Sequence, residues 1–74
     1  MKENRRFIVE SWFNDYEDLF KRSGVDRWLN QPEGTMQKFF KYGVPLNNRR
    51  INRAYRKITQ MITHFELLKT ETDQ

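Results

Sequence analysis

Apolar side chains recur at intervals of three and four residues along most of the chain, which is the spacing of helices that bury one face. The first run extends from Ile8 to about Ser23-Gly24, where the glycine can adopt the left-handed conformation that ends a helix. A break near Asn14-Asp15 is an alternative within this run. A short second helix or turn is predicted over residues 25–29, and Asn30 suits the tight turn that follows it.

A third helix is predicted over residues 32–42. Pro32 is suited to the first helical position, and Glu33 would lie near the positive end of the helix dipole. Gly34 lowers helix stability, for which either a close approach of another backbone or neutral variation would account. Gly43 is expected to end the helix. Three apolar side chains of this helix are predicted to face the core: Met36, Phe39 and Phe40.

The longest helical pattern follows, and either Asn47 or Asn48 is expected to cap its first turn. Its apolar seam consists of Ile51, Tyr55, Ile58, Met61, Ile62, Phe65 and Leu68, with Ala54 alongside. The polar residues 69–74 are predicted to form a frayed tail. No segment shows the sustained alternation of a strand. The chain is therefore predicted to be all-α, with one domain over residues 1–74 built as a small bundle of about four helices.

A chain of 74 residues has room for one domain, and its small core must be filled by large side chains. Six Phe, three Tyr and two Trp meet that need. Five of these rings could alternatively form a stacking platform for single-stranded nucleic acid: Trp12, Phe13, Trp28, Phe39 and Phe40. They fall on the apolar faces of the predicted helices, which favours core packing.

The residues that several classes of site require are missing. There is no Cys, and the single His64 has only Glu66 as a nearby acidic partner, so no metal site, catalytic cluster or cofactor is predicted. No apolar run approaches the roughly 20 residues that span a bilayer. The first residues lack the apolar core of a signal peptide. We expect a non-enzymatic intracellular protein, cytoplasmic or nucleoid-associated, with no membrane partner.

Charge is segregated along the chain. No Asp or Glu lies between Glu33 and Glu66, whereas the basic residues of this stretch are Lys38, Lys41, Arg49, Arg50, Arg53, Arg56 and Lys57. The first 33 residues carry six basic and seven acidic side chains, and the last nine carry a net charge of −2. The residues between them therefore carry a net charge of +7, which the two ends reduce to the overall +4. A segregated positive field attracts polyanions, of which nucleic acid is the commonest. A solvated basic face without a special partner is the simpler alternative.

Two short predicted helices meet at residues 29–32, between a longer helix before them and another after them. A helix-turn-helix has this arrangement, in which one helix supports the next and the second presents its outer face to a DNA groove. With its apolar side chains buried, the third helix carries on its outer face or edge Thr35, Gln37, Lys38, Lys41 and Tyr42. Gln can bond adenine through two hydrogen bonds, and Lys can reach guanine or phosphate.

The segment PEGTMQKFFK, which begins at Pro32, is followed by Gly43, Leu46 and the Arg-rich helix. Together these features resemble the recognition-helix region of lambda-repressor-like helix-turn-helix domains of phages and mobile elements, over about residues 25–62. The resemblance implies DNA-facing positions for Thr35, Gln37, Lys38 and Lys41. It also implies that phosphate lies near the start of the next helix, at Arg49, Arg50 and Arg53.

The predicted function is sequence-specific binding of double-stranded DNA, by a small transcriptional regulator or a phage or plasmid accessory protein. The helix over residues 32–42 would read the major groove. Because one small domain covers little DNA, specific recognition usually needs a homodimer that presents two such helices. Spare apolar surface for that contact is expected on the first helix or at Phe65, Leu67 and Leu68. Two alternatives are RNA binding and a protein-interaction module or inhibitor that binds an acidic partner protein without touching DNA.

Overall fold

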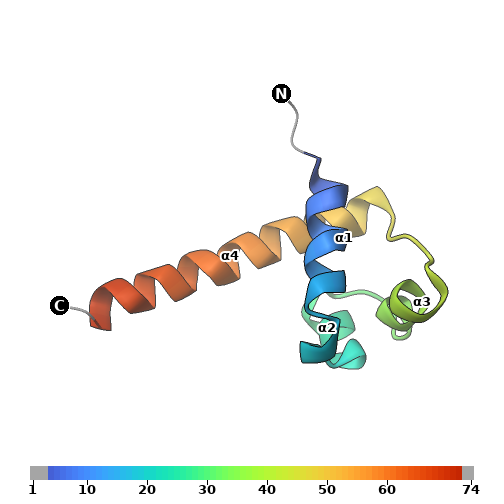
Figure 1. Ribbon diagram of the computed structural model, residues 1–74, viewed down its shortest axis with the longest axis horizontal. Helices are drawn as coiled ribbons and strands as arrows, with labels where there is room; N and C mark the ends of the chain where they lie inside the picture. The colour runs from blue at the N-terminus through green and yellow to red at the C-terminus, as the bar shows by residue number, and fades with distance from the viewer. Residues whose placement is uncertain (1–3, 73–74) are drawn as a thin grey trace.

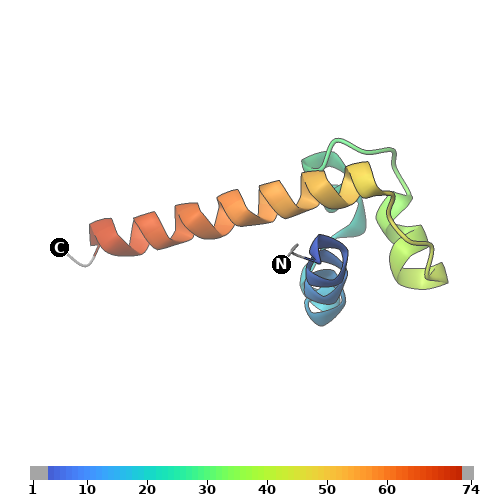
Figure 2. The same ribbon diagram turned by 90° about the horizontal axis from the view of Figure 1, so that it is seen from above.

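The computed structural model describes residues 4–72, which form four α-helices and one 3-10 turn, with no strand among them (Figure 1). The elements are α1 (Arg5–Asp15), the 3-10 turn η1 (Glu17–Leu19), α2 (Arg22–Trp28), α3 (Thr35–Tyr42) and α4 (Asn48–Thr72). α1 packs across the beginning of α4, and α2 packs against α3 (Figures 1 and 2). The predicted all-α class is confirmed.

The first helical run is interrupted just after Asp15, close to the break that was the alternative at Asn14-Asp15. Asn and Asp are weak helix formers, so interruption here costs little. The interruption lets Phe20 fold back onto α1. Its ring centroid lies 5.1 Å from that of Trp12 and 5.7 Å from that of Phe13. These ring contacts explain why the chain turns instead of continuing as one helix.

The predicted helix end at Ser23-Gly24 is wrong. Both residues lie inside α2, which begins at Arg22 rather than at Val25. A methyl group at Gly24 would make only an ordinary contact, 3.8 Å from the Cβ atom of Lys21, so the glycine is not required by its surroundings. The sequence signal was misleading because a glycine marks a helix end only where the backbone takes the left-handed conformation.

Three local turn and cap signals are confirmed. Asn30 has a φ of 53° and Gly43 a φ of 67°, which is the left-handed conformation expected at both positions. Asn47 caps α4, because its side-chain oxygen accepts a hydrogen bond from the Arg50 amide at 2.9 Å. Asn48, the other candidate, is the first helical residue.

The third helix begins at Thr35 rather than at Pro32, so Pro32 and Glu33 lie in the preceding turn and not in the helix. Gly34 has a φ of +92°, a backbone conformation that residues other than glycine rarely adopt. A Cβ atom at this position would meet nothing within 4 Å. The close backbone approach that the sequence suggested is therefore absent, and the turn conformation is the reason for the glycine.

A buried carboxylate replaces the usual N-cap side chain of α3. Asp26 on α2 is 2% exposed, and its oxygens accept hydrogen bonds from the Gly34 amide at 2.9 Å and the Met36 amide at 3.1 Å. The side-chain amide of Gln31 donates a third bond at 2.8 Å. A negative charge is favoured at the N-terminus of a helix, where unpaired N–H groups gather. Asp26 thus links α2 by hydrogen bonds to the turn and to the first residues of α3.

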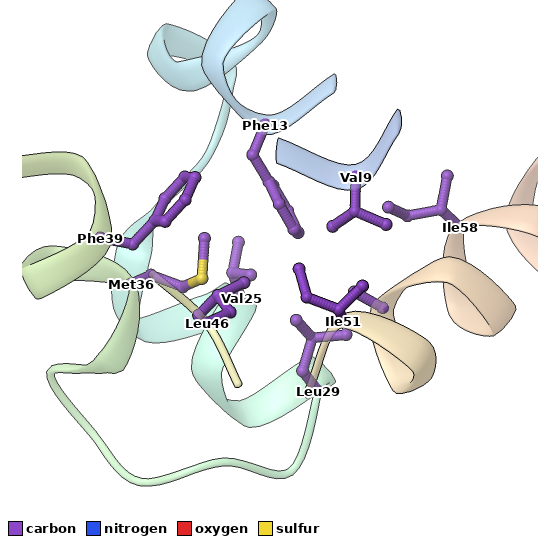
Figure 3. Packing of buried hydrophobic residues seen from close by; sticks show 10 residues of the cluster. Val9, Phe13, Val25, Leu29, Met36, Phe39, Leu46, Ile51 and Ile58 are labelled. Carbon is purple, nitrogen blue, oxygen red and sulfur yellow. The ribbon is translucent and has the colours of Figure 1, made fainter. Parts of the chain in front are cut away.

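Ten apolar side chains from the four α-helices and from the connections that follow α2 and α3 form the core (Figure 3). They are Val9, Phe13, Val25, Leu29, Met36, Phe39, Leu46, Ile51, Ala54 and Ile58. The predicted inner face of α3 is confirmed, with Phe40 half-buried against this core. The five rings considered as a stacking platform belong to the core or pack against it, and Trp12, Trp28 and Phe40 are the half-buried ones.

Only the first part of α4 belongs to the core. Beyond Ile58 every described residue, 59–72, is exposed, and the helix projects from the rest of the protein (Figures 1 and 2). The second part of the predicted seam, at Met61, Ile62, Phe65 and Leu68, is therefore not core. The other helices have 7 to 11 residues and are too short to cover a helix of 25. The helix continues to Thr72, past the point at residue 69 where fraying was predicted, while residues 73–74 lie outside the described range.

Candidate nucleic-acid interface

α3 lies at the end of the protein opposite the projecting part of α4 (Figure 1). Four of the side chains predicted on its outer face or edge are exposed, namely Gln37, Lys38, Lys41 and Tyr42, and Thr35 is half-buried. The Thr35 hydroxyl donates a hydrogen bond to the Pro32 carbonyl at 2.6 Å, so it helps to shape the turn. The face itself therefore offers two Lys and one Gln to a ligand.

One hollow brings the start of α3 and the start of α4 together. Thr35 and Lys38 line it from α3, Arg50 from α4, and the connection over residues 44–46 closes it. Glu33 also lines this hollow and is the single acid among its residues. A phosphate seated here would meet two cations, while Glu33 at the edge would oppose deep entry of an anion.

A second hollow gathers the three predicted arginines beside the α2–α3 turn. It is lined by Asn30, Gln31, Pro32, Asn47, Arg49, Arg50 and Arg53. No acid is among these residues. Arg50 lines both hollows, so it joins the outer face of α3 to the arginines of α4 in one continuous surface.

Arg53 has a structural task that the sequence did not indicate. Its Nη1 atom donates hydrogen bonds to the carbonyl oxygens of Leu29 and Asn30, both at 3.0 Å. These carbonyls lie at the C-terminal end of α2, where a positive charge is favoured by the helix dipole. The Arg53 guanidinium therefore holds α4 to the turn through its Nη1 atom. Of the three predicted arginines, Arg49 and Arg50 remain to contact a ligand.

The remaining predicted residues lie apart from these hollows. Gln37, Lys41 and Tyr42 line neither hollow. Lys41 and Tyr42 sit at the C-terminal end of α3, where the Lys41 ammonium is 5.4 Å from the centre of the Tyr42 ring. Sequence reasoning missed Asn30, Gln31 and Asn47 as lining residues. The two asparagines had been identified only as turn and cap residues, and Gln31 carried no signal at all.

Within residues 4–72 no group of three or more His, Cys, Asp or Glu is arranged to hold a metal ion. No helix in the same range is long and apolar enough to cross a bilayer.

The connection between α2 and α3 spans residues 29–34, which is longer than the three or four residues of a common helix-turn-helix turn. Its path is fixed by the Asp26 carboxylate on one side and the Arg53 guanidinium on the other. Comparison of the chain with protein-family models, with curated proteins and with solved structures finds no match.

Proposed function

We propose that the protein binds double-stranded DNA, with the outer face of α3 in the major groove and the start of α4 on the phosphate backbone. α2 and α3 would then act as a helix-turn-helix, with α2 as the supporting helix. Regulation of transcription, or an accessory role on phage or plasmid DNA, is the function that this mode of binding would serve.

The observation that carries the proposal is the position of Arg50. This residue lines the hollow that contains Lys38 and the hollow that contains Arg49, so three cations from two helices share one surface. Phosphates bound there would fix the register of the protein on the duplex. Gln37, exposed on the same helix as Lys38, would then meet base edges in the groove.

Replacing Arg49 and Arg50 by alanine is expected to weaken binding to all duplex sequences alike. With Lys38, Lys41, Arg49 and Arg50 on phosphates, log K should fall against log salt with a slope of about −4, because each contact releases counterions worth about −0.9. The double variant should show a slope of about −2. The measurement is duplex binding by fluorescence anisotropy over a salt series, repeated with single-stranded RNA.

Lys69→Ala is the matched control, since it removes one positive charge from the far, exposed end of α4. Its slope should equal that of the unaltered protein. Absence of duplex binding at low salt would contradict the proposal and leave an acidic protein as the better partner for this surface. Tighter binding to RNA than to duplex DNA would also contradict it.

Gln37→Ala is expected to reduce sequence discrimination while leaving the fold unchanged. The side chain is exposed, so the free energy of unfolding should change by no more than about 0.5 kcal/mol. Loss of a two-bond contact with a base should cost about 1–3 kcal/mol on a selected site and much less on random duplex. Competition between the two duplexes measures this difference, with Gln60→Ala on the exposed side of α4 as the control. Equal losses on both duplexes would show that Gln37 contacts only the backbone.

A further inference from the structure

The projecting part of α4 carries an apolar stripe that no other described element covers. Met61, Ile62, Phe65 and Leu68 are 44%, 47%, 59% and 47% exposed, and successive members fall on one side of the helix. The stripe continues the buried line of Ile58, so it is the uncovered half of a face whose other half is core. An isolated helical segment of this length is marginal in water without packing against its apolar side.

A groove between α1 and α4 extends this stripe onto the body of the protein. It is lined by Ile8, Val9, Trp12, Tyr55, Ile58, Thr59 and Ile62, which are almost all apolar. Ile8 is 46% exposed at its rim. A helix laid along the stripe would therefore also contact α1, and its apolar side chains would enter the groove.

The distribution of charge along α4 indicates which partner helix fits the stripe. Between residues 48 and 57 the helix has five basic side chains and no acid, whereas residues 58–72 contain Glu66, Lys69 and Glu71. Two copies of α4 side by side in parallel would oppose basic to basic and acidic to acidic segments. In two antiparallel copies that meet along the stripe, the acidic end of each helix, at Glu71, instead lies beside Lys57 at the end of the basic segment of the other, and the helix dipoles also become complementary.

We infer that the stripe binds a second copy of this chain, with the two α4 helices antiparallel. A two-fold axis near residue 64, close to the middle of the stripe from Met61 to Leu68, brings the two stripes together. The partner's Glu71 then lies alongside Lys57, and the partner's Leu68 enters the groove beside α1. The net negative charge of residues 58–72 disfavours an anionic membrane as the occupant.

The contact is small. The 14 exposed residues 59–72 span about 21 Å at 1.5 Å per residue, and a pair of helices of that length buries less than the roughly 800 Å² per partner of a standard interface. The dimer is therefore expected to dissociate at micromolar concentrations. Self-association is measured without nucleic acid, so its result is independent of the function proposed above.

Sedimentation velocity from about 1 µM to 1 mM should show a shift from monomer to dimer. Phe65→Glu is expected to abolish the shift, while Leu67→Glu should leave it unchanged. Leu67 is the matched control because it is 57% exposed and lies about 200° around the helix from Phe65. Both side chains are outside the core, so the thermal midpoint at low concentration reports that each variant folds.

The orientation is tested by a spin label at Thr72→Cys, in a chain that has no other cysteine. Thr72 lies eight residues beyond the axis, so antiparallel helices place two labels about 24 Å apart, whereas parallel helices place them about 10 Å apart. The short distance would overturn the proposal. A chain that stays monomeric at 1 mM would overturn it as well, and sedimentation with phosphatidylserine-containing vesicles would then assign the stripe to a membrane surface.

Discussion

Phe13→Ala is expected to remove a large share of the free energy of unfolding. The Phe13 side chain is fully buried, and its ring contacts those of Trp12, Phe20, Phe39 and Phe40, with centroid distances of 5.5 to 6.4 Å. Truncation of a buried phenylalanine costs about 3–5 kcal/mol. At about 0.05–0.15 kcal/mol per residue, a domain of this length has only roughly 4–11 kcal/mol to lose.

Urea unfolding followed by tryptophan fluorescence measures this loss, because Trp12 lies against Phe13. Phe7→Ala is the control on the same helix, since Phe7 is 66% exposed and should change stability by no more than about 0.5 kcal/mol. If the two variants had the same unfolding midpoint, Phe13 would not be the centre of the core.

Asp26→Ala should be the most damaging change to a polar side chain. It would leave without their acceptor the buried Met36 amide and the half-buried Gly34 amide and Gln31 side-chain amide. An unsatisfied buried donor costs about 1–3 kcal/mol, and since the three share one site we expect a combined loss of about 3–5 kcal/mol. Because α3 would lose its anchor to α2, duplex binding should weaken along with stability.

Asp26→Asn removes the negative charge of the side chain while keeping its shape. The amide keeps one acceptor oxygen but turns its NH₂ group toward another N–H donor, so a loss of about 2–3 kcal/mol is expected from denaturant unfolding. Asp18→Ala on the exposed 3-10 turn is the control and should be nearly neutral. An Asn variant as stable as the unaltered protein would show that charge at the start of α3 contributes nothing.

Features set by neighbouring residues could be predicted from the sequence. Asn30 and Gly43 take the left-handed conformation and Asn47 caps its helix, because each depends on the backbone within a few residues. The inner face of α3 follows from the spacing of its apolar side chains. The exposure of Gln37 and Lys38 follows from the same spacing, so this part of the candidate site was visible in the sequence.

Features set by contacts across the chain could not be predicted in this way. The cap of α3 comes from Asp26, eight and ten residues before the amides it binds, and Arg53 bonds carbonyls 23 and 24 residues away. The fold-back of Phe20 depends on the rings of α1 and not on the residues beside it. The end of the core at Ile58 depends on the lengths of the other helices, since the apolar period of α4 continues unchanged past this point.

Because the core ends at Ile58, the two parts of α4 before and after this residue are under different evolutionary constraints. Substitutions in residues 59–72 leave every core side chain in place, whereas substitutions of Ile51, Ala54 or Ile58 disturb the core. The sequence after Ile58 can therefore diverge, lengthen or be exchanged by recombination without loss of the folded domain. Descendants of this protein could acquire new assembly partners through such changes while they inherit the surface formed by α3 and Arg50 unaltered.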